Sequence, residues 1–306
     1  MGTVLVTGAT GFVGGRIARR LAARGDDVVA VVRSPSDELD ALDVEQRIVP
    51  LGDLEGLQQA GRRASAVVHA AATAGPDHAT AHAVNVDGTQ AVAGAALLAG
   101  QRLIHISTTS VYDLAATGDR EVREDDPLVA RDGEAPPTSS SGSAYATTKA
   151  AAEDVVTLAI RNGLVGTILR PPAVLGAGPT STWGTRVPAR IRDGQAPAIR
   201  PESTFGWVHV EDLVDAVVAA LDADAEVVRG LTANVVGGHV TFGDYRDAVV
   251  AFLGQVPDTA PEPGPIWRGR YATVNLTATL DVRPSRSFDA AMAEIADSWQ
   301  GGTPRG

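Results

Sequence analysis

The feature that most constrains the fold is a glycine-rich turn between an apolar segment and a helix at the start of the chain. Residues 4–6 are consecutive aliphatic residues, which are typical of a strand buried in a parallel sheet. Gly8, Gly11 and Gly14 follow at three-residue intervals, and an amphipathic pattern then runs to Gly25. Such glycines allow a tight turn, a close backbone approach to a pyrophosphate and close helix–strand packing. The segment therefore predicts a dinucleotide-binding βαβ unit.

Apolar segments continue to alternate with helical patterns beyond this unit. They predict strands at 28–32, 47–51, 66–70, 103–107 and 166–169, helices at 83–98 and 144–160, and a strand followed by a helix at 208–221. This rhythm predicts an α/β fold with a doubly wound parallel sheet of the Rossmann type. Beyond residue 171 the pattern becomes irregular, and it ends with a predicted helix at 288–299.

Lysine is almost absent from this chain. Lys and Arg together number 26, and Lys149 is the only one of them that is not arginine. A compact ammonium at this position indicates chemistry that a planar guanidinium does not perform. Tyr145 lies four residues before Lys149, so on a helix both side chains share one face. The spacing alone also fits a surface pair, and the functional interpretation depends on the glycine turn.

With these motifs in place, the chain resembles the extended short-chain dehydrogenase/reductases, also called the NAD-dependent epimerase/dehydratase family. The resemblance covers most of the chain. It is carried by 7–14, 52–54, 69–72, 85–89, 107–112, Tyr145 with Lys149, 170–172 with Gly176, and 207–213. It implies a Rossmann domain from residues 1–170, to which 207–237 return. It also implies a small C-terminal substrate-binding lobe made of 171–206 and 238–306.

The resemblance further implies a nicotinamide cofactor. Its expected contacts are Gly8, Thr10, Gly11, Phe12, Val13, Gly14, Arg33, Ser34, Asp53, Leu54, Ala70, Ala71, Ala72, Asn85, Tyr145, Lys149 and Pro171. Arg33 and Ser34 follow the second strand with no acid before Asp37, and they suit a 2′-phosphate, so NADP(H) is favoured over NAD(H). By resemblance Asp53 meets the adenine amino group, and the alternative is a plain turn residue after Gly52. Asn85 either lies by the active-site helix or is a buried hydrogen-bonding residue.

Three residues are expected to perform catalysis. Tyr145 would be the general acid, and Lys149 would lower its pKa and bind the cofactor ribose. Thr108, four residues before Tyr112, would hold the substrate oxygen by resemblance, with Ser110 as a substrate contact. His69 and His105 lie inside apolar strands and are expected to be satisfied core residues.

The expected substrate contacts are Ser110, Pro172, Ala173, Trp183 and Phe205. In family members that bind nucleotide sugars, the positions of Ala173 and Phe205 carry Asn and Arg. Apolar residues here favour a neutral or hydrophobic ketone or aldehyde, and thus an NADPH-dependent carbonyl reductase. The alternatives are an epimerase or dehydratase of a nucleotide sugar and a non-catalytic NADP(H)-binding module.

The composition narrows the partners to small molecules. The net charge of −11 argues against nucleic acid, and the chain has no Cys and no metal-ligand spacing among its six His. No apolar run approaches the ~20 residues of a membrane span, and the first residues read as a strand, so a cytoplasmic enzyme is expected. Residues 115–142 are expected to form a solvated loop or a flap over the substrate. By resemblance, the helices at 83–98 and 144–160 would form a homodimer contact.

Overall fold

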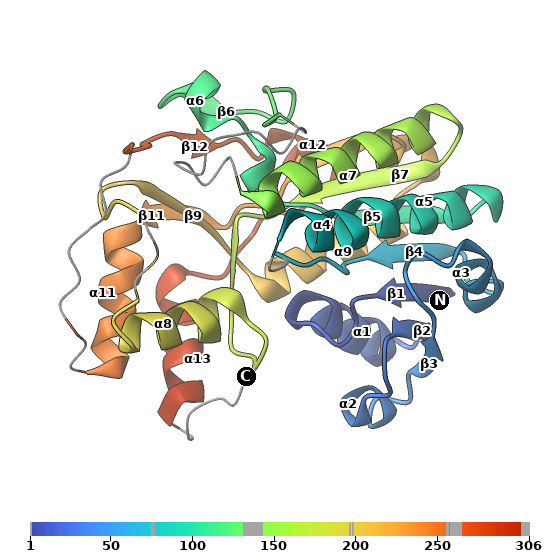
Figure 1. Ribbon diagram of the computed structural model, residues 1–306, viewed down its shortest axis with the longest axis horizontal. Helices are drawn as coiled ribbons and strands as arrows, with labels where there is room; N and C mark the ends of the chain where they lie inside the picture. Colours follow the sequence, from blue (N-terminus) through green and yellow to red (C-terminus); the bar gives the residue numbers. More distant parts are fainter. Residues whose placement is uncertain are drawn as a thin grey trace.

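A seven-stranded parallel sheet forms the centre of the structure, a computed structural model that describes residues 2–74, 77–130, 143–195, 197, 199–254, 257 and 265–300. The strand order is β10-β7-β5-β4-β1-β2-β3, and each pair of neighbours is parallel (Figure 1). The strands are β1 (Thr3–Thr7), β2 (Asp27–Val32), β3 (Glu45–Ile48), β4 (Ala66–His69), β5 (Arg102–Ile106), β7 (Val165–Arg170) and β10 (Leu231–Asn234). This order confirms the predicted doubly wound Rossmann fold.

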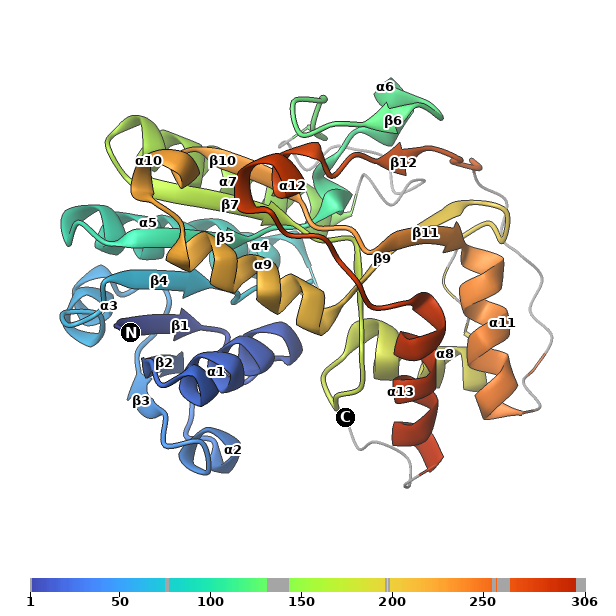
Figure 2. The same cartoon turned by 180° about the vertical axis from the view of Figure 1, so that it is seen from behind.

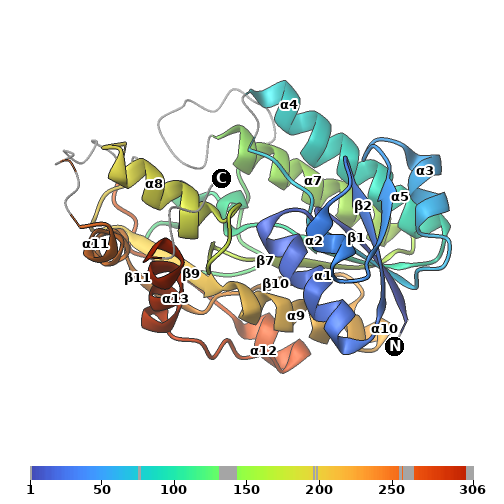
Figure 3. The ribbon, with the colours of Figure 1, turned by 90° about the horizontal axis from the view of Figure 1, so that it is seen from below.

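Helices cover both faces of the sheet, as Figure 3 shows from below. One layer holds α3 (Leu54–Ala60), α4 (His78–His82), a π-helical turn at Ala83–Asp87, α5 (Gly88–Leu98) and α7 (Ala144–Arg161). The other layer holds α1 (Phe12–Arg24), α9 (Val210–Asp222), α10 (Ala225–Val228) and α12 (Val274–Leu280). Alternate residues of β1 serve the two layers, since Leu5 packs under α5 and α7 whereas Val6 packs under α1 and α9. Burial on both faces explains why this strand is apolar throughout.

The second part of the structure is a small lobe built on a three-stranded sheet. Its strands are β8 (Ala173–Leu175), β9 (Thr204–His209) and β11 (Gly238–Thr241). The turn at Thr182–Arg186, α8 (Val187–Arg192), α11 (Phe242–Leu253) and α13 (Phe288–Gln300) pack around this sheet. Above it, α6 (Leu114–Thr117) and the pair β6 (Glu121–Val122) and β12 (Arg270–Tyr271) lie along the top of Figure 1.

The boundary between the two parts differs from the one predicted. The helix α12 lies beside β10 (Figure 2), and its Leu276 and Leu280 belong to the core of the large sheet, although the sequence placed 238–306 in the lobe. Trp207 lies in β9 of the lobe sheet rather than in the returning segment. The chain thus crosses between the parts more often than residue order suggests, because distant segments complete the same core.

Two local predictions also shift. The third strand occupies Glu45–Ile48 instead of 47–51, because Val29 of β2 pairs with Glu45. The helix predicted at 83–98 begins with the π-helical turn. Of the expected loop or flap, residues 131–142 lie outside the described residues. Within the described part of the chain, no helix is both long and apolar enough to span a membrane.

Candidate functional site

The glycine turn adopts the geometry that its spacing predicts. Gly8 has φ +73°, a left-handed conformation that glycine adopts without strain. A Cβ on Gly8 would lie 2.6 Å from the Ala71 nitrogen, and one on Gly14 would lie 2.1 Å from the Gly8 carbonyl oxygen. The turn is therefore pressed against the end of β4 on one side and against α1 on the other. Only glycine fits at either position.

This turn lies where the strand order reverses, between β1 and β4, which is the ligand-binding position of open α/β sheets. Gly11 is the N-cap of α1, and no side chain caps this helix end. The first-turn N–H groups of a helix carry a partial positive charge and bind anions. Thr10, Phe12, Val13 and the segment 70–72 retain some exposure around this backbone cradle. The cradle suits the pyrophosphate of a dinucleotide.

Arg33 and Ser34 follow β2 at the same edge of the sheet. Both are exposed, and Arg33 forms no ion pair with the described residues. Asp53 is the N-cap of α3, since its carboxylate accepts a hydrogen bond from the Gly56 nitrogen at 3.0 Å. Leu54, the first residue of α3, is 39 % exposed. Arg33 is thus a cation available at the surface, whereas Asp53, expected as an adenine contact or a turn residue, is the N-cap of α3.

Arg16 and Phe12 hold a lobe segment over the amino end of α1. The Arg16 guanidinium donates to the Ala177 carbonyl at 2.7 Å and to Glu211 at 3.1 Å. A Cβ on Gly178 would lie 2.8 Å from the Phe12 ring. These contacts fix the segment 176–178 beside the glycine turn.

The second group of candidate residues lies on α7 and at the end of β5. Ser143 caps α7 by accepting from the Ala146 nitrogen at 3.2 Å, which places Tyr145 in the first turn and Lys149 in the second. The Thr108 hydroxyl lies close enough to the Tyr145 hydroxyl to act against the effect of burial on the pKa of the phenol. The Thr108 hydroxyl in turn lies 3.2 Å from the Ser110 hydroxyl. The predicted residues Thr108, Ser110 and Tyr145 therefore meet at one point.

Lys149, one turn after Tyr145 on α7, is buried, with 1 % exposure. Its Nζ donates to the Ile106 carbonyl at 2.7 Å and lies 3.1 Å from His105 Nε2. Burial lowers the pKa of Lys149 to about 8, and the charge of Glu153 opposes this shift. The ammonium is consequently held against β5.

The acidity of Tyr145 differs from the expectation. Burial raises the pKa of Tyr145 to about 12, and the group that acts in the opposite direction is the Thr108 hydroxyl. Lys149 was expected to lower the pKa of Tyr145, but it does not contribute to the shift, because its ammonium is bound to His105 and Ile106 of β5. At neutral pH the phenol keeps its proton, as a general acid must.

A buried ion pair supports the site from below. Glu153 lies one turn after Lys149 on α7 and binds Arg170 of β7, with an oxygen–nitrogen distance of 2.6 Å. Ser107 donates to the same carboxylate, and Arg170 also donates to the Tyr112 hydroxyl at 2.8 Å. This network fixes α7 against the ends of β5 and β7. Sequence reasoning missed Glu153, although its four-residue spacing from Lys149 was a usable signal.

Asn85 is a buried hydrogen-bonding residue. It lies in the π-helical turn, bonds both backbone groups of Thr73, and donates to the Thr148 hydroxyl at 2.9 Å. Asn85 thus joins the segment after β4 to α7. It is a buried hydrogen-bonding residue and it also lies beside the helix of Tyr145, so the two interpretations left open for it are compatible.

The two core histidines behave differently. His69 is fully paired, with Nδ1 2.7 Å from the Thr7 hydroxyl and Nε2 2.9 Å from the Thr89 hydroxyl. His105 binds Lys149 through Nε2, but its buried Nδ1 has no partner within the described residues. The expectation of a satisfied core residue is therefore confirmed for His69 and wrong for His105.

The expected substrate contacts divide into two groups. Pro172 lies just after β7, next to the expected cofactor contact Pro171, whose carbonyl accepts a hydrogen bond from the Thr109 nitrogen at 2.9 Å beside the catalytic candidates. Phe205 is only 5 % exposed, and its ring lies 4.9 Å from that of Trp183 and 4.7 Å from that of Tyr245. Ala173 is also buried, in β8. Ala173, Trp183 and Phe205 are therefore part of the apolar interior of the lobe.

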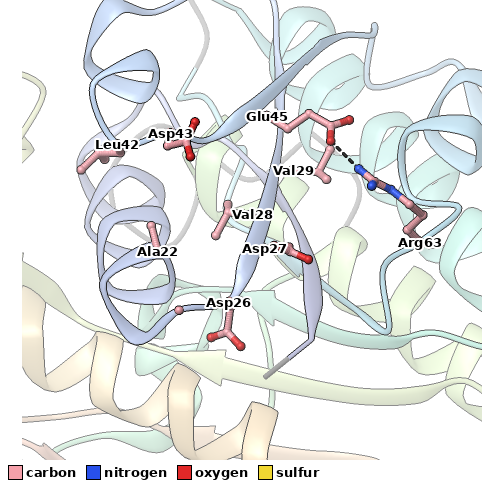
Figure 4. Close-up of a pocket in the computed structure, with 10 residues that line it drawn as sticks. Ala22, Asp26, Asp27, Val28, Val29, Leu42, Asp43, Glu45 and Arg63 are labelled. Atoms are coloured by element: carbon pink, nitrogen blue, oxygen red, sulfur yellow. Dashed lines mark hydrogen bonds and ion pairs between the residues drawn. The ribbon is translucent and has the colours of Figure 1, made fainter.

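A separate hollow lies at the opposite edge of the sheet (Figure 4). It is lined by residues around the amino end of β2, including Asp26, Asp27 and Val28, with Glu45 paired to Arg63 at its rim. Because Tyr145 and the glycine turn lie at the carboxyl ends of the strands, this hollow is not part of the site described above.

Comparisons with known proteins agree with this arrangement. Residues 4–235 match the NAD dependent epimerase/dehydratase family. The chain is 32 % identical over 251 residues to sterol demethylase protein B of Methylococcus capsulatus, covering 79 % of this chain and 71 % of that protein. It is also 32 % identical over 291 residues to ceramide reductase of Caulobacter vibrioides, covering 93 % and 81 %.

Among solved structures, the fold is similar to that of UDP-glucose 4-epimerase of Thermus thermophilus in complex with NAD. The TM-score is 0.76 and the identity 26 %, over 98 % of this chain and 99 % of the other. The chain therefore belongs to the NAD-dependent epimerase/dehydratase family and is an NAD(P)-dependent oxidoreductase of the short-chain dehydrogenase/reductase type.

Proposed function

We propose that this protein is an NADPH-dependent carbonyl reductase that acts on a neutral or hydrophobic ketone or aldehyde. The observation that carries the proposal is the proximity of the Thr108 and Tyr145 hydroxyls at the end of β5, with the buried Lys149 one turn after Tyr145 on α7. Two hydroxyls at one point can bind a single carbonyl oxygen, and one of them can protonate it.

Each residue has a distinct task in this reaction. Thr108 donates a hydrogen bond to the substrate oxygen, and Tyr145 donates the proton that the developing alkoxide needs. Lys149, held against β5, offers its remaining N–H to the cofactor ribose. Ser110 and Pro172 contact the substrate. The bound nicotinamide cofactor supplies the hydride.

The backbone cradle of the glycine turn is assigned to the cofactor pyrophosphate, with Ala70, Ala71, Ala72 and Pro171 along the nicotinamide half. Arg33 and Ser34 are assigned to the 2′-phosphate of NADP(H), because a guanidinium without an ion pair among the described residues and a hydroxyl stand together after β2. Asp53 and Leu54 border the adenine position.

The cofactor assignment predicts the effect of Arg33→Asp. Charge-assisted hydrogen bonds contribute roughly 1.5–3 kcal/mol each, so the change should shift the ratio of NADPH to NADH affinity at least about tenfold toward NADH. Fluorescence titration with both cofactors measures this ratio. A wild-type protein that binds NADH more tightly than NADPH would contradict the assignment.

The apolar residues Ala173, Trp183 and Phe205 support a substrate without a diphosphate. Two relatives bear names that refer to a sterol and to ceramide, and both of these are largely apolar molecules. The likeness to a UDP-glucose 4-epimerase supports the second candidate, an epimerase or dehydratase of a nucleotide sugar.

One experiment separates these candidates. NADPH oxidation is followed over a panel of ketones and aldehydes, and a panel of UDP- and dTDP-sugars is incubated without added reductant. Reduction of apolar ketones with freely exchanging NADPH is expected. Conversion of a nucleotide sugar by protein that retains NAD would establish the epimerase instead, and retained cofactor without any turnover would indicate a binding module.

The same proposal includes a homodimer that forms through α5 and α7. These helices lie side by side on one face of the sheet (Figure 1), and Leu158 of α7 and Leu98 of α5 are 61 % and 67 % exposed. Large apolar side chains on neighbouring helices suit a contact between two copies.

A further inference from the structure

His105 is in contact with the buried ammonium of the active-site helix. Its Nε2 lies 3.1 Å from Lys149 Nζ, and both residues are at most 1 % exposed. The second acceptor for the ammonium is the Ile106 carbonyl at 2.7 Å. Two acceptors on β5 therefore fix two of the three N–H directions, and no described residue accepts the third, which can bind a ligand.

The contact determines the protonation state of the imidazole. A protonated His105 would place two cations in van der Waals contact inside the protein, which is strongly unfavourable. Burial and the neighbouring ammonium both hold the pKa of His105 well below its usual value. Nε2 then carries the lone pair that accepts from Lys149, and the ring proton lies on Nδ1.

This tautomer leaves a buried donor unpaired. Nδ1 of His105 has no partner among the residues described, whereas the neighbouring His69 satisfies both ring nitrogens. A buried polar group without a partner costs stability, so an apolar residue would serve better in a strand that only packs. What the imidazole provides at this position is the bond to Lys149.

We propose that His105 is a positioning residue that holds the Lys149 ammonium in its charged form and directs its third N–H toward the cofactor and Tyr145. The proposal rests on the assignment of Lys149 to the reductase site. It assigns no contact between His105 and the substrate.

Among the described residues, three ionisable groups interact with Lys149. They are Glu153 on α7, His105 on β5 and His69 on β4, with Arg170 on β7 acting through its pair with Glu153 and Tyr145 one turn earlier on α7. Glu153 favours the charged lysine, while burial disfavours it. Loss of the His105 acceptor removes a hydrogen bond that is stronger to the ammonium than to the neutral amine, so the pKa of Lys149 should fall further.

The single lysine makes this effect directly measurable. A protein grown with ¹³C- and ¹⁵N-labelled lysine gives one side-chain resonance, because Lys149 is the chain's only lysine. NMR titration of this resonance in the full chain should give a Lys149 pKa lower by at least about one unit in His105→Phe than in wild type. His105→Gln, whose carbonyl can replace Nε2 as acceptor, should recover most of the difference.

His69→Gln is the matched control, since His69 is an equally buried imidazole in the same layer that hydrogen-bonds Thr7 and Thr89 instead of Lys149. It should leave the Lys149 pKa within about half a unit of wild type. If His105→Phe does not fold, His105→Leu takes its place. An unchanged pKa in the folded apolar variant, or an Nε2–H tautomer of His105 by ¹⁵N NMR, would overturn the proposal.

Kinetics then test the role in the reaction. These measurements use a ketone that wild type reduces. In His105→Phe, the apparent pKa of the alkaline limb of the kcat–pH profile should fall by the same amount as the Lys149 pKa. In His105→Gln, it should return toward the wild-type value. An unmoved limb would overturn the positioning role. If no ketone is reduced by wild type, the proposed function fails while the NMR result stands, so the two failures are distinguishable.

Discussion

At the scale of single residues, the Tyr145 hydroxyl is expected to contribute to proton transfer and not to cofactor binding. Its hydroxyl is the proton donor that the proposed reaction needs, whereas its ring and backbone remain in place when the hydroxyl is removed. Tyr145→Phe should therefore lower kcat by ~10²- to 10⁴-fold, the usual contribution of a positioned general acid, and change the NADPH dissociation constant by less than about threefold. Steady-state kinetics and fluorescence titration measure the two effects. Near-normal turnover would show that another group protonates the substrate.

Lys149 places a cost on folding that depends on pH. Its pKa falls from 10.5 to about 8 on burial, so the unfolded chain binds more protons between these values. The cost is present in full below pH 8 and disappears as the pH rises toward 10.5. Relative to Lys149→Met, which has no such cost, wild type should gain about 2 kcal/mol of unfolding free energy between pH 7 and pH 10.

Denaturant unfolding of both proteins at the two pH values measures this difference, and the variant serves as the control for other alkaline effects. Parallel pH dependences in the two proteins would mean that the ammonium is solvated. The expected result would identify Lys149 as a residue kept for function at the expense of stability.

At the scale of elements, the contact between α1 and β1 depends on Gly14. A methyl group there would meet the Gly8 carbonyl at 2.1 Å and the Gly8 carbonyl carbon at 2.6 Å, and neither is a side chain that can move aside. Gly14→Ala should lower the unfolding free energy by about 1–3 kcal/mol, as overpacking does. It should also weaken NADPH binding at least tenfold, because the cradle widens.

Gly94→Ala on α5 is the matched control. A Cβ at Gly94 would lie 3.4 Å from Leu54 Cδ1, close to an ordinary contact, so alanine should stabilise the helix by up to about 1 kcal/mol. Chemical denaturation and cofactor titration of both variants test the pair. Equal effects of the two substitutions would contradict the close packing of α1 on β1.

Elements that depend on local signals could be predicted from the sequence. The glycine spacing predicted β1 and α1 together with the end of α1 at Gly25, whose φ is +87°, and the apolar periodicity predicted α7 within one residue. Features that depend on distant partners could not be predicted. The return of α12 to the large sheet needs β10 to be in place, and the unpaired Nδ1 of His105 follows from where α7 brings Lys149. Local periodicity carries no information about such partners.

At the scale of the whole molecule, ion pairs join the Rossmann domain to the lobe. Arg16 of α1 binds Glu211 of α9 and Glu294 of α13, and Glu294 also binds His209 at 2.8 Å. The segment 176–178 lies between these groups, because Ala177 accepts from Arg16 and donates to Glu294. The glycine turn and the lobe are therefore fixed relative to each other through charged contacts around one segment.

The proposed dimer is the property of the whole molecule that is most easily tested. Leu158 of α7 is 61 % exposed on the face that the contact would bury, and Val274 of α12 is 64 % exposed on the opposite face of the sheet. A buried charge without a partner is strongly unfavourable at an interface. Light scattering should give wild type twice the 31.5 kDa mass of one chain, and Leu158→Glu a single chain, while Val274→Glu stays dimeric. A monomeric wild type would rule out the proposed dimer. A dimer that persists in Leu158→Glu but dissociates in Val274→Glu would place the contact on the opposite face of the sheet.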